Sequence, residues 1–207
     1  DDQRFRPSIK QSFRWLVQKM RGTFHHIFVS EATASARQLT ISLLIAAIIR
    51  WGTICRCVVL SHSMEPQLLP GDQVLVEKMS RMWQRQPERG SIVAFRAPKE
   101  ALGMLTGNQR RHKVFVKRVV ALQGDKIQIT QGKLYINDQR QQEPPGVQQD
   151  SDCNWGPAYV PQGHIAVLGD HRKLSLDSHV WGFLPDKQVI GKAVLLYWPQ
   201  DRIHIFD

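Results

Sequence analysis

The chain has 207 residues, of which 42% are hydrophobic and 22% are charged. This composition is ordinary for a globular protein with a core of its own, and it excludes a wholly disordered chain. The formal net charge of +10 raises the question of a nucleic-acid partner. However, the sequence has no dense basic run interleaved with aromatic residues, and an anionic membrane surface explains the excess charge at least as well. We therefore expect no nucleic-acid partner.

The N-terminal segment, residues 1–37, is basic. Within residues 1–38 there are seven basic residues and three acidic ones, and hydrophobic residues recur at roughly helical spacing. Such a basic amphipathic stretch is typical of a membrane-surface segment or of the remains of a targeting peptide, and a plain surface helix is an equal alternative. Because the chain begins with Asp1 rather than methionine, we expect a fragment or a processed form.

A long apolar run over residues 38–55 predicts one helix. At ~1.5 Å per residue its length is roughly 27 Å, just short of the ~30 Å hydrocarbon layer of a membrane. Arg50 lies near one end, where its side chain can reach the headgroups, and Trp51 suits the interface. We expect a single transmembrane helix, with a buried helix of a soluble domain as the alternative. The preceding basic residues predict that everything after this helix lies on the trans side of the membrane.

Beyond residue 66 the pattern changes to short apolar strands separated by turns, which predicts a mostly antiparallel, β-rich domain over residues 56–207. The dipeptide Gln131-Gly132 is a hairpin signal between two of these strands. The segment from Gln139 to Trp155, rich in Gln, Pro, Gly, Asp and Asn, is expected to be a loop insertion. The expected strands are Gln73–Glu77, Ser91–Arg96, Val114–Leu122, Lys126–Thr130, Lys133–Asn137, His164–Leu168 and Val189–Trp198.

The three cysteines, Cys55, Cys57 and Cys153, are odd in number and lack the spacing of metal ligands. We therefore expect no metal and no cofactor. Whether any of the thiols pair stays open.

Directly after the apolar run comes Ser61-His62-Ser63-Met64-Glu65-Pro66. Two serines one residue apart in an extended segment point their side chains to the same side. One could then attack a carbonyl while the other donates a hydrogen bond to the oxyanion that forms. A Ser-x-Ser pair alone is more often a polar loop that leaves a membrane, so this interpretation depends on the residues that accompany it.

A lysine, Lys117, lies in the middle of the apolar strand Val114–Leu122. If its side chain faces the interior, desolvation disfavours the ammonium form and lowers the pKa, which would make the amine a possible general base. In Ser–Lys catalysis a neutral amine removes the serine proton in place of the histidine of a triad. The ordinary alternative is an exposed strand lysine.

A third unusual segment runs from Leu168 to Gly182 and follows a strand. It gathers Gly, Asp, Ser and charged residues into one turn. Such a loop is suited to holding a lysine and a serine through hydrogen bonds, although a generic polar turn is the simpler interpretation.

Together the three stretches resemble type I signal peptidases, the Ser–Lys membrane endopeptidases. The family's Ser-x-Ser-Met-x-Pro box stands at 61–66, its Lys-Arg strand at 117–118, and its Gly-Asp-x-Arg…Ser-x-Asp-Ser…Trp-Gly box at 169–182. The resemblance covers about residues 38–199. It implies a β-rich catalytic domain of the signal-peptidase and repressor type, preceded by a transmembrane helix. It also implies that the substrates are pre-proteins whose signal peptides are cut after small residues at −1 and −3.

The resemblance assigns a role to each matched residue. Ser63 would be the nucleophile, Lys117 the general base, and Ser61 a side-chain oxyanion donor beside the Ser63 backbone N–H. Ser175 would orient Lys117, and Asp177 would support the site. Arg118 is expected as a further supporting residue, and the substrate pocket is expected to contain Met64, Pro66, Leu68 and Val116.

Within the family, the likeness is greatest to the thylakoidal processing peptidases of plastids and their cyanobacterial relatives. His179 stands where many bacterial members have arginine. His171 and Leu174 depart from the family pattern, but neither position carries the proposed chemistry. The resemblance therefore implies a plastid thylakoid membrane or a bacterial or cyanobacterial inner membrane, and the mitochondrial inner-membrane peptidases remain possible relatives.

Two other classes of protein are alternatives. A self-cleaving Ser–Lys repressor would suit the basic charge, but it needs a DNA-reading helix-turn-helix in its first 60 residues, where Leu39–Ile49 is far too apolar. A catalytically silent membrane scaffold is the other alternative, and the intact Ser63 and Lys117 argue against it.

Overall fold

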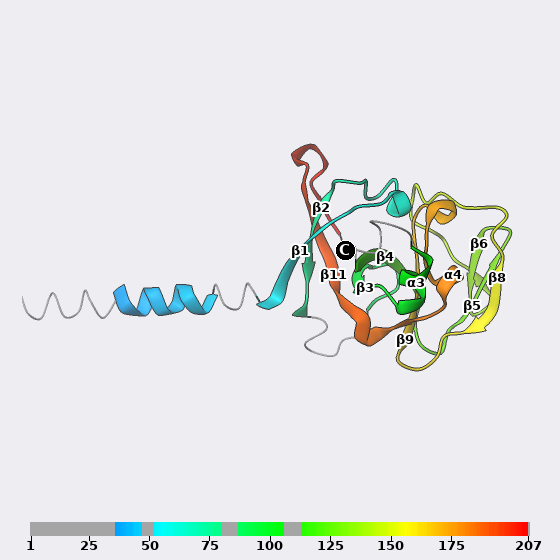
Figure 1. Cartoon of the computed structure of the whole chain (residues 1–207), viewed down its shortest axis with the longest axis horizontal. Helices are drawn as coiled ribbons and strands as arrows, with labels where there is room; N and C mark the ends of the chain where they lie inside the picture. Colours follow the sequence, from blue (N-terminus) through cyan, green and yellow to red (C-terminus); the bar gives the residue numbers. More distant parts are fainter. Residues whose placement is uncertain (1–35, 47–51, 80–86, 106–112, 207) are drawn as a thin grey trace, which may run out of the picture. The chain divides into compact units, whose positions relative to one another are not determined.

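The computed structural model describes residues 36–46, 52–79, 87–105 and 113–206 (Figure 1). The chain divides into two compact units, Asp1–Arg50 and Trp51–Asp207. In the first unit residues 36–46 form a helix with exposed apolar side chains, among them Leu39 and Leu43. None of the helices in the described ranges combines the length and the apolar character needed to cross a membrane. The predicted segment 1–37 falls almost wholly outside the described residues, as does part of the predicted span, residues 47–51.

The predicted helix 38–55 is wrong at its C-terminal end, because Ile54 and Cys55 begin a strand, β1 (Ile54–Val58). β1 pairs antiparallel with β2 (Gln73–Glu77), with Ile54 opposite Glu77. Cys55 and Cys57 pack against the hydrophobic core, whereas Arg56 and Val58 between and after them are exposed. This alternation has the period of two that a strand needs. The apolar run continues through Cys55, but its last residues pair with β2 as a strand and do not extend the helix.

The predicted antiparallel β architecture is confirmed. In the described part of the second unit, an eight-stranded sheet has the order β1-β2-β11-β3-β4-β9-β10, with β12 paired to β11. Every neighbouring pair in it is antiparallel. Its further strands are β3 (Ile92–Arg96), β4 (Val114–Ala121), β9 (His164–Leu168), β10 (Leu184–Pro185), β11 (Val189–Trp198) and β12 (His204–Ile205).

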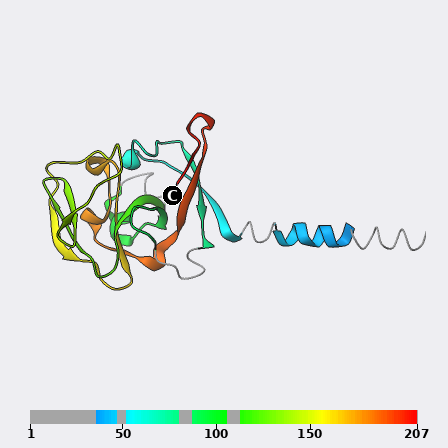
Figure 2. The ribbon, with the colours of Figure 1, turned by 180° about the vertical axis from the view of Figure 1, so that it is seen from behind.

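A smaller four-stranded sheet has the order β7-β6-β5-β8. Its strands are β5 (Lys126–Thr130), β6 (Lys133–Ile136), β7 (Gln139–Arg140) and β8 (Trp155–Tyr159). The predicted hairpin turn joins β5 to β6, and both of its residues, Gln131 and Gly132, have positive φ angles of 50° and 73°. In Figures 1 and 2 this sheet lies on the side of the domain away from β1 and β2.

Short helical turns connect the strands. They are η1 (His62–Met64), α3 (Lys99–Met104), η3 (Arg172–Leu174), α4 (Ser178–Trp181), η4 (Asp186–Gln188) and η5 (Gln200–Arg202). Three clusters of buried hydrophobic residues form the core: one holds Met64 and Val116, another surrounds Phe95, and the third joins the small sheet to β9 through Ile127 and Leu168.

The predicted loop insertion Gln139–Trp155 begins and ends in strands, since Gln139 and Arg140 form β7 and Trp155 begins β8. Sequence reasoning missed β8 because Gly156-Pro157 reads as a turn. Proline has no N–H to donate to a ladder, but β8 is an edge strand of its sheet, where that loss is tolerated.

Candidate active site

The side chains of Ser63 and Lys117 meet in the structure, although 54 residues separate them in the chain. Lys117 Nζ donates a hydrogen bond of 2.5 Å to Ser63 Oγ and a second, of 3.2 Å, to the Val116 carbonyl. Both residues are buried, each with only 4% of its surface exposed. A hydroxyl and an amine at this distance are in reach for direct proton transfer.

The two residues meet because η1 packs against β4. Met64 of η1 and Val116 of β4 belong to the same cluster of buried hydrophobic residues, which holds their neighbours Ser63 and Lys117 side by side. The short turn of η1 is closed by backbone bonds from Glu65 N to His62 O (3.2 Å) and from Leu68 N to Met64 O (2.9 Å). Ser63 therefore lies in a 3-10 turn rather than in the extended segment that the sequence suggested.

Burial is the main influence on the charge of Lys117. Desolvation lowers the pKa of Lys117 from 10.5 to about 8, although Asp177 and Asp170 act in the opposite direction. The ammonium form of lysine cannot accept a proton, so only a neutral lysine can act as a base. With its lowered pKa, Lys117 has a substantial neutral fraction at mildly alkaline pH.

This pKa predicts a pH dependence for any activity that uses Lys117 as a base. If neutral Lys117 is the base, kcat/KM should be low when the amine is protonated and should rise with pH through a midpoint of about 8. The measurement is a pH–rate profile on a peptide substrate, with Lys117→Arg as the control, because a guanidinium stays charged and should not restore activity. A profile that still climbs steadily through pH ~10, near the solution value of lysine, would contradict a depressed pKa.

Ser61 lies beside the pair, with its Oγ 3.0 Å from Ser63 Oγ. Ser61 itself is in an extended conformation directly before η1 (φ −137°, ψ 159°), and it is exposed. The two serine hydroxyls therefore share one side of the site, as predicted, even though their backbones differ.

The segment 169–177, called here the loop below Ser63, packs against the backbone of Ser63. His171 N donates to the Ser63 carbonyl at 3.1 Å. Gly169 packs so closely against the Ser63 carbonyl and the Ser175 side chain that a Cβ at position 169 would overlap with both. Asp177, fully buried, accepts a hydrogen bond of 2.8 Å from Gly169 N. The Asp177 carboxylate thus fixes the loop that contacts Ser63.

Asp177 also caps α4. It accepts from His179 N at 3.2 Å, and His179 Nδ1 lies 2.7 Å from the same carboxylate oxygen. This hydrogen bond raises the pKa of His179, which favours the imidazolium form. A charged His179 can therefore act as the cationic partner of Asp177.

The predicted contact between Ser175 and Lys117 does not form. Ser175 is buried at 6% exposure, and its Oγ has no hydrogen-bond partner among the described residues. The Ser175 side chain packs against Gly169 instead. Sequence spacing could place Ser175 in the site but could not decide which neighbour its hydroxyl faces.

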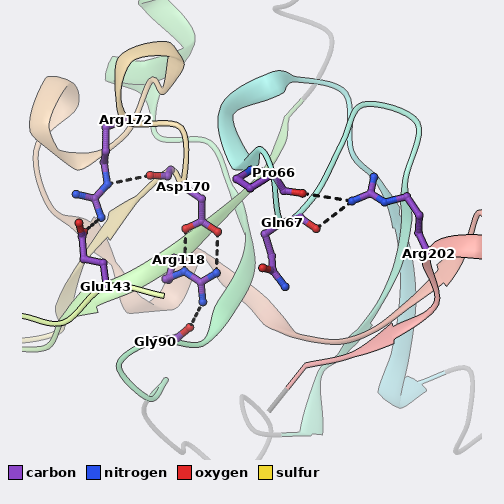
Figure 3. A network of polar contacts seen from close by, with 9 residues as sticks. Pro66, Gln67, Gly90, Arg118, Glu143, Asp170, Arg172 and Arg202 are labelled. Carbon is purple, nitrogen blue, oxygen red and sulfur yellow. Dashed lines mark hydrogen bonds and ion pairs between the residues drawn. The ribbon is translucent and has the colours of Figure 1, made fainter. Parts of the chain in front are cut away.

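Arg118 makes a bidentate pair with Asp170, with hydrogen bonds of 2.8 Å and 2.7 Å (Figure 3). The third contact of its guanidinium is to the Gly90 carbonyl at 2.6 Å. The pair is largely buried, with side-chain exposures of 12% and 2%. It ties β4 to the loop after β9, and the supporting role of Arg118 in the site stays a prediction.

A cavity of about 380 Å³ opens at the Ser63–Lys117 pair. Met64 and Val116, two of the four residues expected in a substrate pocket, line this cavity. Leu68 does not, because it is completely buried in the core, and Pro66 does not, because it is exposed beyond the turn. The wall residues that sequence reasoning missed are Val58, Val59, Leu60, Met104, Leu105, Val114, Phe115, Leu174 and Leu176.

Two charged residues outside the recognised motifs also support this region. Arg202 donates to Asp72 at 3.0 Å and to the carbonyls of Pro66 and Gln67 at 3.3 Å and 3.4 Å, which fixes the segment that follows Ser63 (Figure 3). Glu143 pairs with Arg172 on the other side of the site. No sequence signal marked either residue.

The cysteines take no part in the site. All three are free thiols, and burial raises the pKa of Cys55 and of Cys57. Within the described residues, no group of three or more His, Cys, Asp or Glu side chains is arranged to hold a metal ion.

The chain matches the family model described as signal peptidase, peptidase S26, over residues 32–198. It therefore belongs to the signal peptidase family, and the resemblance seen in the sequence is confirmed.

The relatives include plastid and cyanobacterial proteins. Over 143 residues, 69% of this chain, it is 41% identical to thylakoidal processing peptidase 1, chloroplastic, of Arabidopsis thaliana and 41% identical to signal peptidase I of Leptolyngbya laminosa. The match spans 42% of the Arabidopsis protein, less than half of its length, and 68% of the Leptolyngbya protein. Among solved structures, a signal peptidase I from Enterococcus faecalis is 25% identical with a TM-score of 0.39, covering 52% of this chain and 97% of that one.

Proposed function

We propose that this protein is a membrane-bound serine endopeptidase that removes N-terminal signal or thylakoid-transfer peptides from translocated pre-proteins. The observation that carries the proposal is the 2.5 Å contact between Lys117 Nζ and Ser63 Oγ in the wall of a cavity lined mostly by apolar residues. Membership of the signal peptidase family supports the same reaction.

The proposed chemistry uses the two side chains in turn. Neutral Lys117 takes the proton from Ser63 Oγ, and the oxygen attacks the carbonyl carbon of the scissile peptide bond. The oxyanion accepts hydrogen bonds from the Ser61 hydroxyl and the Ser63 backbone N–H. Protonated Lys117 then gives its proton to the leaving amine, which departs as the new N-terminus of the mature protein. Lys117 next activates a water molecule that hydrolyses the acyl-enzyme and releases the signal peptide.

The membrane setting is part of the proposal. The exposed apolar helix at 36–46, the basic N-terminal segment and the plastid and cyanobacterial relatives favour a single-pass protein with its catalytic domain on the trans side. The membrane would be that of a thylakoid or of a bacterial or cyanobacterial cell, and the direct partners would be membrane lipid and the signal peptides of pre-proteins.

The substrate preference follows from an extended peptide in the cavity. Alternate side chains of such a peptide point into the enzyme, so −1 and −3 would be selective and −2 would point outward. Three of the residues that line the cavity, Val59, Met64 and Val116, are only 4%, 1% and 8% exposed and belong to the hydrophobic core. These residues cannot readily move aside, so small side chains such as alanine should fit best.

We therefore expect that precursors with Ala-x-Ala before the cleavage site are cut and that leucine or phenylalanine at −1 blocks cleavage. Overpacking of ~1–3 kcal/mol corresponds to a loss of about tenfold to a hundredfold or more. The experiment incubates detergent-solubilised protein with a thylakoid-lumen precursor, scans −1, −2 and −3, and sequences the new N-terminus. Equal tolerance at all three positions would leave the Ser–Lys chemistry standing but refute the signal-peptidase specificity.

A further inference from the structure

A buried ion pair joins the loop below Ser63 to the polar segment between β7 and β8. Arg172 Nη2 contacts Glu143 Oε1, and the two side chains are only 5% and 7% exposed (Figure 3). Gln149 holds the other carboxylate oxygen of Glu143 with a hydrogen bond of 2.8 Å. Neither charged side chain lines the cavity at Ser63.

The Arg172 end of this pair leads to the nucleophile. Arg172 Nε donates to the Gly169 carbonyl at 3.0 Å. Gly169 packs directly against the Ser63 carbonyl, and His171 N donates to the same carbonyl. A continuous series of contacts therefore runs from Glu143 through Arg172 and the 169–171 backbone to Ser63.

Backbone contacts dock the same polar segment on the site. Gln148 forms an isolated parallel bridge with His171, made by hydrogen bonds from Gln148 N to Asp170 O (2.8 Å) and from Arg172 N to Gln148 O (3.0 Å). Gly146 lies so close to the Pro66 ring that a side chain at position 146 would overlap with it. The segment 141–150 thus contacts both the loop below Ser63 and the turn after it.

We propose that Glu143 and Arg172 are positioning residues that hold Ser63 in line with Lys117, and that segment 141–150 is part of the active-site scaffold. This inference rests on the proposed function, since it concerns the same nucleophile. The pair acts through the loop and touches neither the substrate nor the reacting atoms.

The physical chemistry of a buried ion pair favours a role in geometry over a role in stability. The desolvation of two buried charges largely offsets their attraction, so an apolar pair of similar volume can fold as well or better. What an apolar pair cannot supply is the hydrogen bond from Arg172 Nε to the Gly169 carbonyl. Stability and positioning can therefore be separated by experiment.

The experiment compares wild type with Glu143→Gln and with the double variant Glu143→Leu, Arg172→Met. The double variant removes both charges at once, so it leaves no unpaired buried ion. We expect its Tm to stay near that of wild type while kcat falls by about 10- to 100-fold, because small misplacements of a reacting group cost up to about that much. KM and the pH midpoint that reports Lys117 should stay unchanged. The kcat of Glu143→Gln should fall less, because the glutamine amide keeps a hydrogen-bond acceptor for Arg172.

The matched control is Asp138→Asn, which removes the exposed ion pair between Lys126 of β5 and Asp138 of the turn between β6 and β7. It should leave kcat, KM and Tm unchanged. A folded double variant with wild-type kcat would overturn the positioning role, and so would a fall in kcat that merely follows Tm. If the double variant does not fold, the same readings on Glu143→Gln decide: a folded variant with full kcat refutes the proposal.

Failure of the proposed function gives a different result. In that case the wild-type protein itself would not cleave any precursor, and Ser63→Ala would change nothing. Failure of the positioning role alone leaves wild-type cleavage intact and sensitive to Ser63→Ala.

Discussion

Ser63→Ala and Lys117→Met should each abolish precursor cleavage, with a loss in kcat of at least about 10³-fold. The reason is the direct contact between the two groups: without the hydroxyl the proposed nucleophile is missing, and without the amine no other base among the described residues is hydrogen-bonded to it. Because the two residues act as a unit, the double variant should be scarcely worse than either single variant. The measurement is the release of mature protein from a purified precursor under single-turnover conditions.

The control for this prediction is the fold of each variant, since a collapsed core would also abolish activity. Met at position 117 keeps most of the aliphatic length of lysine, so circular dichroism and Tm should show an intact domain. Substantial turnover by either single variant, well above the uncatalysed background, would refute the assignment of the pair. Losses that multiply in the double variant would show that the residues act independently.

Gly169→Ala should have the second largest effect, about a 10²-fold loss of kcat. A Cβ at this position would overlap with the Ser63 carbonyl and with the Ser175 side chain. One of these is the backbone carbonyl of Ser63, so we expect relief of the overlap to shift Ser63 relative to Lys117. The measurement is kcat together with the thermal stability of the variant.

Gly103→Ala is the matched control for that substitution. Gly103 lies in α3, nothing lies within 4 Å of the position that its Cβ would take, and its φ is not in the left-handed region. Alanine there should be neutral or slightly stabilising, as expected for a helix. A Gly169→Ala variant as active as Gly103→Ala would mean that the loop below Ser63 does not determine its position.

The sequence predicted those parts of the fold and site that depend on local pattern. Alternating strands such as Gln73–Glu77 and Lys126–Thr130 have the predicted bounds, because their side chains follow the period of two that a half-buried sheet requires. The meeting of Ser63 with Lys117 followed from the matched motifs rather than from any local signal, since the two residues are far apart in the chain.

What the sequence could not predict depends on distant contacts and on burial. Glu143 lies in a polar loop with no periodicity, 29 residues from the arginine that it pairs with, and Arg202 lies 130 residues from Asp72. Leu68 was expected in the substrate pocket because it is close to Ser63 in sequence, but a fully buried core position prevents that. Leu174 lines the cavity because the fold brings the loop after β9 next to residues of β4, and this long-range contact has no local sequence signal.

The burial of Lys117 has a consequence for the fold as a whole. Its pKa of about 8 means that the folded protein holds this proton less tightly than the unfolded chain does. The unfolded lysine, with a pKa of ~10.4, keeps its proton over a wider range, so folding is penalised at neutral pH and the penalty fades between the folded value and pH ~10.4. The domain is therefore less stable at neutral pH than its apolar core alone would allow. Evolutionary selection for thermal stability alone would remove this lysine, and selection for cleavage would have to retain it.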